Sequence, residues 1–214
     1  MKQEIRNNYI IKNFPYIKEN HNHFIEYANL AHQRFNFAYG NKTSFNQNSS
    51  TWFYRYYNIT CLTFGSSLYY KLFSDLQNLF KEITNNKKPL WYQSWLNFHK
   101  SNEVLDWHNH YECLLHGYIS IDPKESETEF EDYKIKFFKE HIYSTITLPT
   151  KNFNLFNSES WWFTVKTGDI VLFPSSLSHA VETKEGDNVR TSLAFNVFVE
   201  GKIGDNKELT ELIL

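Results

Sequence analysis

The hydrophobic pattern of this 214-residue chain changes its period near residue 90, and this change limits the folds open to it. In residues 22–38 and 66–84, apolar side chains recur every three or four positions, which predicts two amphipathic helices. Ser66 or Ser67 is a candidate N-cap for the second helix. After residue 90 the period is two, which is typical of strands. Helices followed by a run of strands predict an α+β protein, with an antiparallel sandwich or barrel backed by helices on one side.

The candidate strands alternate apolar and polar residues and are separated by Pro, Gly, Asn or Asp. They lie at 90–98, 113–121, 127–131, 141–147, 162–165, 169–173, 178–182 and 189–199. Residues 41–51 are expected to form a loop, and the tail 202–214 is expected to be a short helix or frayed. The length fits one domain spanning 1–214, in which 1–89 is mainly helical support and 90–200 forms the β core.

The charge balance disfavours some partners. Lys and Arg number 22 against 24 Asp and Glu, so there is no net positive field to attract nucleic acid or an anionic membrane. The two cysteines, Cys61 and Cys113, have no metal-type spacing, and there is no leader-like segment or membrane-length apolar run. We therefore expect a cytoplasmic protein, monomeric or homodimeric, that acts on a small molecule or a peptide.

Two segments carry histidines in extended patterns. Asp106, His108, His110 and Glu112 alternate along the chain, so in a strand all four would share one face and could chelate one ion. An isolated pair of this kind is more often a solvent-facing strand edge. His179 lies between two aliphatic residues of its face, where a core histidine is the usual interpretation. The presence of both segments in one chain favours a metal site.

The last predicted strand has two unlike faces. One face carries Val189, Thr191, Leu193, Phe195 and Val197, and the other carries Arg190, Ser192, Ala194 and Asn196. The apolar face is expected to pack on the core, against the helices. If the other face points inward, Arg190 needs an anionic partner, because an unpaired buried guanidinium is costly. An outward, solvated Arg190 is the alternative. Arginine in a chain with only four of them favours bidentate carboxylate binding.

These motifs together resemble a known family. The order is His108-x-His110, then GDIVLFPS at 168–175, then His179, then Arg190-x-Ser192. It resembles the Fe(II)/2-oxoglutarate-dependent dioxygenases, and is most similar to an oxygenase subgroup related to prolyl hydroxylases and common in phages and marine bacteria. The resemblance covers roughly 91–199, and the first 90 residues match no family that their sequence identifies.

The resemblance implies a double-stranded β-helix, or jelly-roll, core that holds one Fe(II). His108 and His179 match the family's proximal and distal histidine ligands. His110 stands where the family usually has Asp or Glu, and the favoured ligand set is therefore three histidines. Two alternatives stay open. The carboxylate ligand could be Glu112 or Asp106, or His110 could orient substrate while water fills the vacant position.

The resemblance also implies 2-oxoglutarate as cosubstrate. Arg190, helped by Ser192, would bind its C5 carboxylate, and Asn97, Tyr118 and Trp95 are weaker candidates for lining its pocket. The implied reaction is hydroxylation of a substrate with release of succinate and CO2. One alternative is a cupin-type three-histidine dioxygenase without 2-oxoglutarate, against which the Arg190-x-Ser192 pair argues. The other is a jelly-roll module that binds metal without turnover.

The remaining histidines are interpreted more simply. His116 lies at an even offset from the metal positions and could face inward beside the site. The others have no convergent partners and are expected on the surface or on helix faces; they are His21, His23, His32, His99 and His141.

Overall fold

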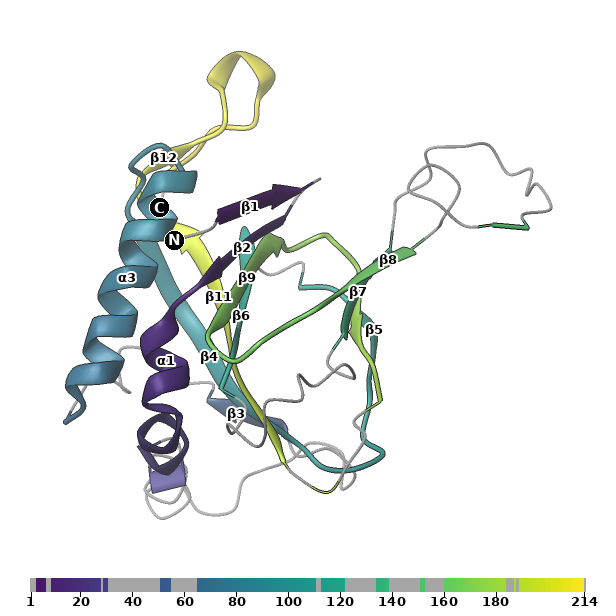
Figure 1. Cartoon of the computed structure of the whole chain (residues 1–214). Coiled ribbons are helices and arrows are strands. Elements are labelled where there is room, and N and C mark those ends of the chain that lie inside the picture. Colours follow the sequence, from purple (N-terminus) through teal and green to yellow (C-terminus); the bar gives the residue numbers. More distant parts are fainter. Residues whose placement is uncertain are drawn as a thin grey trace.

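Two large antiparallel sheets, a layer of helices and a small C-terminal hairpin make up the part of the chain that the computed structural model describes. The described residues are 3–6, 9–27, 29–30, 51–54, 65–110, 113–121, 134–138, 151–152, 160–183, 187 and 189–213. Figure 1 shows the helices on one side of the larger sheet and the smaller sheet on its other side. The predicted α+β arrangement, with antiparallel sheets backed by helices, is confirmed.

The larger sheet has seven strands, and each pairs antiparallel with its neighbours. In spatial order they are β1 (Gln3–Arg6), β2 (Tyr9–Asn13), β9 (Asp169–Pro174), β6 (Leu115–Ser120), β11 (Arg190–Val199), β4 (Pro89–His99) and β3 (Thr51–Tyr54). The strands β1, β2 and β3 were not predicted. They add to the two edges of a centre that is formed by β9, β6, β11 and β4, all of which lie beyond residue 88.

The smaller sheet has the order β5 (Leu105–His108), β10 (His179–Val181), β7 (Lys134–Phe138) and β8 (Ser160–Thr164). Its inner face packs against the larger sheet through a second apolar cluster, which includes Phe137, Phe173 and Val181. The sequence did not predict β7 as a strand. The strands predicted at 127–131 and 141–147 lie outside the described residues.

The longest helix, α3 (Ser67–Ile83), confirms the prediction for 66–84. The Ser66 side chain caps its N-terminus by accepting a hydrogen bond from the Tyr69 backbone N–H at 3.3 Å. A short helix α1 (Pro15–Glu19) precedes helical residues 21–27 and 29–30, and the rest of the predicted helix 22–38 lies outside the described residues. Among the described residues, no helix combines the length and apolar character needed to cross a membrane.

The strand β11 decides which side of the larger sheet faces the helices. Leu193, Phe195 and Val197 are buried in the main apolar cluster together with Leu72 and Leu76 of α3. The alternate residues of β11 therefore face the smaller sheet, as the two unlike faces of this strand predicted. This face carries Arg190, Ser192, Ala194 and Asn196, all of them buried.

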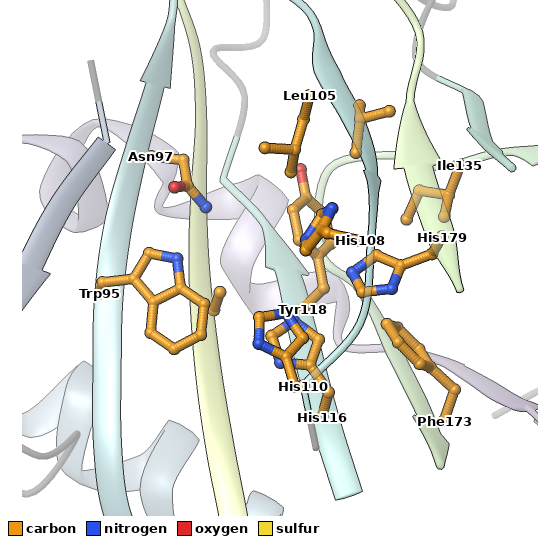
Figure 2. A pocket seen from close by; sticks show the side chains of 12 residues that line it. Trp95, Asn97, Leu105, His108, His110, His116, Tyr118, Ile135, Phe173 and His179 are labelled. Carbon is orange, nitrogen blue, oxygen red and sulfur yellow. The ribbon is translucent and has the colours of Figure 1, made fainter. Parts of the chain in front are cut away.

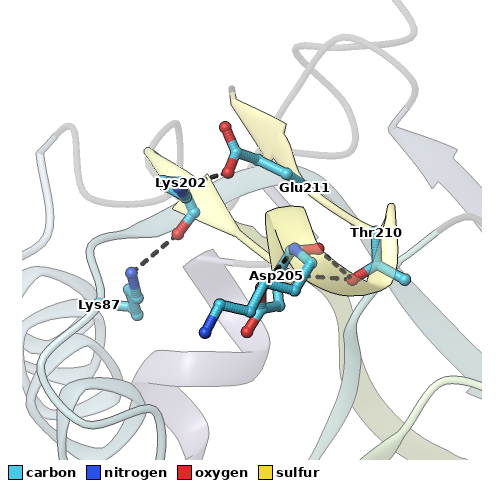
Figure 3. Close-up of polar contacts among 6 residues, drawn as sticks. Lys87, Lys202, Asp205, Thr210 and Glu211 are labelled. Atoms are coloured by element: carbon cyan, nitrogen blue, oxygen red, sulfur yellow. Dashed lines mark hydrogen bonds and ion pairs between the residues drawn. The ribbon is translucent and has the colours of Figure 1, made fainter.

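The C-terminal residues form a small hairpin rather than a frayed tail (Figure 3). The strands β12 (Lys202–Ile203) and β13 (Leu212–Ile213) pair around a single 3-10 turn, η2 (Asn206–Glu208). Lys87, just beyond α3, ties the hairpin to the body by donating a hydrogen bond to the Lys202 carbonyl at 2.9 Å. The short helix predicted within 202–214 is thus limited to η2.

Gly117, in the middle of β6, leaves room for the side chains of its two cross-strand neighbours, Phe195 of β11 and Leu172 of β9. A Cβ at this position would lie 2.1 Å from two ring atoms of Phe195 and 2.7 Å from Leu172 Cδ2. Both neighbours are buried, so the ring has little room to move. We expect Gly117→Ala to lower the free energy of unfolding by roughly 1–3 kcal/mol, as overpacking of a core does. Urea unfolding of the purified variant measures this change.

The matched control is the double variant Gly117→Ala/Phe195→Leu, which removes the ring that the new methyl group would meet. In the double-mutant cycle, the methyl group should cost clearly less in the Phe195→Leu background than in the background that keeps the phenylalanine. An equal cost in both backgrounds would contradict the packing explanation.

Candidate metal centre

Three histidines converge between the two sheets. His108 ends β5 and is the direct cross-strand partner of His179 at the start of β10. His110 follows β5 in a loop that is held by a hydrogen bond from its backbone N–H to the Ser175 carbonyl at 2.9 Å. One ring nitrogen of each histidine is a possible metal ligand, and these three nitrogens all lie within 4.8 Å of one another. Figure 2 shows the rings gathered at one end of a cavity.

Backbone carbonyls orient two of these rings. His108 Nδ1 lies 2.7 Å from the Asp106 carbonyl oxygen, and His179 Nδ1 lies 3.1 Å from that of Leu177. A carbonyl oxygen only accepts, so each Nδ1 must carry the proton and donate it. Each Nε2 is therefore left with its lone pair, which is how a metal-binding histidine is usually held by its surroundings.

Burial also keeps the imidazoles in the form that binds a cation. It lowers the pKa of His179 from 6.5 to about 2, and the neighbouring His108 adds to the effect. Burial likewise lowers the pKa of His108. Both rings are thus neutral near pH 7, and no proton has to leave before a metal ion can bind.

A fourth histidine supports the group from the larger sheet. His116 of β6 stacks on His110 with ring centroids 3.9 Å apart and an interplanar angle of 8°. Its Nδ1 lies 2.8 Å from Asn196 Oδ1, on the adjacent strand β11. His116 is buried, and it faces inward as its even offset predicted. The stacked, hydrogen-bonded ring restricts the orientation of His110.

The cavity beside the histidines has a volume of about 180 Å³ and is largely apolar. Trp95, Asn97 and Tyr118, the three residues predicted to line the pocket, all line it (Figure 2). The sequence did not single out its apolar wall, to which Leu105, Ile135, Phe173 and Val181 contribute. Those side chains belong to strands of both sheets, so their convergence depends on how the sheets face each other.

Arg190 and Ser192 occupy the inner face of β11 next to this cavity. Both are buried, so the outward, solvated alternative for Arg190 does not hold. Ser192 Oγ accepts a hydrogen bond from Asn97 Nδ2 at 3.3 Å, which links it to the cavity wall. The Arg190 guanidinium donates to the Glu182 backbone carbonyl over 3.3 and 3.4 Å, which are long hydrogen bonds.

Asp106 and His108 were predicted to lie on the same face of a strand, but an irregularity in β5 separates them. Between β5 and β10 the register pairs His108 with His179 but Leu105 with Val181, so one extra residue bulges out of β5. Leu105 and His108 consequently both line the cavity, while Asp106 is exposed and outside the group of clustered donor atoms. Glu112, the other candidate carboxylate, lies outside the described residues.

His99 was wrongly interpreted as a surface histidine. Its side chain is only 6% exposed, and it lies on β4 directly opposite Arg190 of β11. The alternation of Trp95, Asn97 and His99 along one strand already places the three on one face. That signal was available in the sequence, but it becomes informative only once the inner face of β4 is known.

The fold and the site together define a class of protein in which a cluster of histidines, suited to bind a divalent metal, lies between two antiparallel sheets. Residues 93–196 match the model of the family described as "Putative 2OG-Fe(II) oxygenase". This match confirms the resemblance to Fe(II)/2-oxoglutarate oxygenases that the motifs indicated. The family is one of oxidoreductases that depend on Fe(II) and 2-oxoglutarate. Among curated proteins, no sequence shows significant similarity to this chain.

Solved structures with similar folds are distant in sequence. AviO1 from Streptomyces viridochromogenes Tue57 is 11% identical, with a TM-score of 0.51 and 90% of each chain covered. HygX from Streptomyces hygroscopicus, solved with nickel and 2-oxoglutarate bound, is 12% identical, with a TM-score of 0.52 and coverage of 90% of this chain and 82% of its own. The epimerase SnoN from nogalamycin biosynthesis is 12% identical, with a TM-score of 0.54 and coverage of 92% and 80%.

Other similarities are partial. The chain spans about half the length of an oxidoreductase of the 2OG-Fe(II) oxygenase family from Burkholderia pseudomallei, with 49% of that chain covered. At these identities the solved structures support the fold, and the chemistry has to be argued from the site itself.

Proposed function

We propose that this chain is an Fe(II)- and 2-oxoglutarate-dependent dioxygenase with a jelly-roll core, which hydroxylates a small molecule or a peptide. The observation that carries the proposal is the convergence of His108, His110 and His179 on one cavity. The strand that carries Arg190 on its inner face forms part of the wall of the same cavity through Ala194. A possible cation site and a buried arginine are therefore carried by the two sheet faces that meet around this cavity, with Arg190 on the same face of β11 as the lining residue Ala194.

The donor set fits iron. Three neutral imidazole nitrogens bind a divalent first-row metal and leave coordination positions for further ligands. When bound, Fe(II) supplies the redox chemistry that couples decarboxylation of 2-oxoglutarate to oxidation of the substrate. With no carboxylate among the three proposed ligands, the charge of the ion stays uncompensated by the protein. This favours an anionic cosubstrate over a neutral one.

The remaining residues bind and orient the cosubstrate. Arg190 and Ser192 would bind the C5 carboxylate, and Asn97 would hold the Ser192 hydroxyl in place. The apolar wall that includes Leu105 and Phe173 excludes water from the space beside the metal position. A buried arginine near the metal site argues against a cupin-type enzyme that uses no 2-oxoglutarate, since such an enzyme needs no carboxylate-binding group there.

Succinate formation tests the proposal. Apoprotein supplied with Fe(II), 2-oxoglutarate and oxygen should form succinate, and omission of the metal should stop it.

Arg190→Lys keeps the charge but loses the bidentate geometry, so its dissociation constant for 2-oxoglutarate should rise by about 10-fold or more. Oxygen consumption that is independent of 2-oxoglutarate would support the cupin-type alternative instead. Tight metal binding without consumption of 2-oxoglutarate would support a non-catalytic metal-binding module.

A further inference from the structure

His99 is a buried polar residue whose Nδ1 has no hydrogen-bond partner among the described residues. Buried imidazole nitrogens are normally hydrogen-bonded, so this nitrogen is available to a group that binds beside it. His99 is the last residue of β4, two positions beyond Asn97, which lines the cavity. By strand alternation its side chain shares the inner face with Asn97 and Trp95.

The cross-strand partner of His99 is Arg190. Side chains of directly opposed residues on one face of an antiparallel pair begin only about 5 Å apart at their Cβ atoms. An anion held by the Arg190 guanidinium would therefore lie within reach of the His99 imidazole. His99 is the last residue of β4 and Arg190 is the first residue of β11. The pair therefore lies at one end of the inner face of the larger sheet.

We propose that His99 is a second binding residue for the carboxylate that Arg190 holds, and that it donates a hydrogen bond from Nδ1 to that carboxylate. The inference rests on the proposed function, in which this carboxylate is the C5 group of 2-oxoglutarate. It assigns to one end of the cosubstrate pocket a pair of donors, a guanidinium and an imidazole, instead of an arginine alone.

The electrostatics of His99 predict a proton-linked binding step. Burial, and next the Arg190 guanidinium, lower the pKa of His99 from 6.5 to about 4, while Glu103 acts in the opposite direction. A carboxylate placed beside the imidazole would favour its charged form and raise this pKa in the complex. The other polar neighbours on this face, Asn97 and Ser192, do not titrate. Cosubstrate binding should therefore take up a proton, and affinity should increase as the pH falls from neutral toward the pKa of the free protein.

Calorimetric titration of 2-oxoglutarate into the Mn(II)-loaded protein tests this without turnover. Measured in buffers of different ionisation enthalpy between about pH 5 and 7, the wild type should take up protons on binding. His99→Phe keeps a planar aromatic ring, slightly larger than imidazole, but removes both nitrogens, and its dissociation constant should rise by about 10-fold. His99→Gln keeps a donor and should retain part of the affinity, but it should lose the proton uptake.

Controls separate this inference from the proposed function. His21→Gln, on the N-terminal helical segment, should bind 2-oxoglutarate like the wild type, and thermal unfolding reports whether each variant is folded. If the wild type does not bind 2-oxoglutarate, the proposed function fails. If the wild type binds it and folded His99→Phe matches its affinity and proton uptake, the inference is overturned while the proposed function stands. Lower affinity with unchanged proton uptake would also overturn it, because His99 would then act only through packing.

Discussion

Replacing His179 with alanine is expected to weaken binding of a divalent metal by at least about 100-fold, because even the loss of a group that merely orients a ligand costs 10- to 100-fold. The imidazole of His179 lies closest to that of His108, with ring centroids 4.1 Å apart, and 5.4 Å from that of His110. Its backbone is fixed in β10 by pairing with strands on both sides. Competition with a chromophoric chelator, using Mn(II) or Ni(II), measures the loss.

The matched control is His21→Ala, which removes a histidine outside the cavity whose Nδ1 lies 3.2 Å from the Lys18 carbonyl oxygen in the N-terminal helical segment. Its metal affinity should stay at the wild-type value. Wild-type affinity in a folded His179→Ala variant would exclude His179 from the site and with it the three-histidine arrangement.

The same measurement decides the identity of the third ligand. If His110 is a ligand, His110→Ala should lose affinity comparably to His179→Ala. Asp106→Asn and Glu112→Gln should then stay within about 3-fold of the wild type, a change of well under 1 kcal/mol in binding free energy. A large loss in either carboxylate variant, with little change in His110→Ala, would establish a two-histidine, one-carboxylate site.

The metal-free protein is expected to lose stability steeply as the pH falls below about 6.5. Burial holds the pKa of His99 at about 4 and that of His179 at about 2, and it also lowers the pKa of His108 and His116. Each of these residues is protonated near its ordinary pKa of 6.5 only when the chain unfolds. The unfolded state therefore binds more protons below this pH, and acid favours unfolding.

The size of the effect follows from the two values above. At pH 5, His99 and His179 should each cost about 2 kcal/mol relative to neutral pH, so together they lower the free energy of unfolding by about 4 kcal/mol. His108 and His116 act in the same direction. Urea unfolding of chelator-treated protein between about pH 5 and 8 measures the change. A flat profile would mean that these histidines titrate near their ordinary pKa of 6.5 in the folded protein as well.

Two variants test which histidines cause this pH dependence of the free energy of unfolding. His99→Phe should remove the contribution of His99 and leave the contributions of the other buried histidines. His21→Ala should leave the profile unchanged, because the ring of His21 is near the surface. Saturating Ni(II) should raise stability at neutral pH, since a ligand that binds only the folded state stabilises it.

Much of the fold was predictable because alternation of residue types reports the two faces of a strand directly. The two unlike faces of β11 were recognised from its sequence, and of the two orientations left open for Arg190 the buried, inward one is observed. The helix α3 was predicted with its cap at Ser66 or Ser67, and Ser66 is the residue that caps it. The first two strands were not predicted, because both are short and are held by strand pairing more than by side-chain pattern: the edge strand β1 pairs with β2, and β2 pairs with β9.

The sequence by itself thus determined the period change near residue 90, the motifs that carry the family resemblance, and the inward faces of regular strands. The tertiary structure decided which of those faces meet. The bulge in β5 turned Asp106 outward, and the register between β4 and β11 placed His99 opposite Arg190. The packing of β6 against the smaller sheet stacked His116 on His110. These outcomes depend on register and contact between strands distant in sequence, and local alternation contains no information about either.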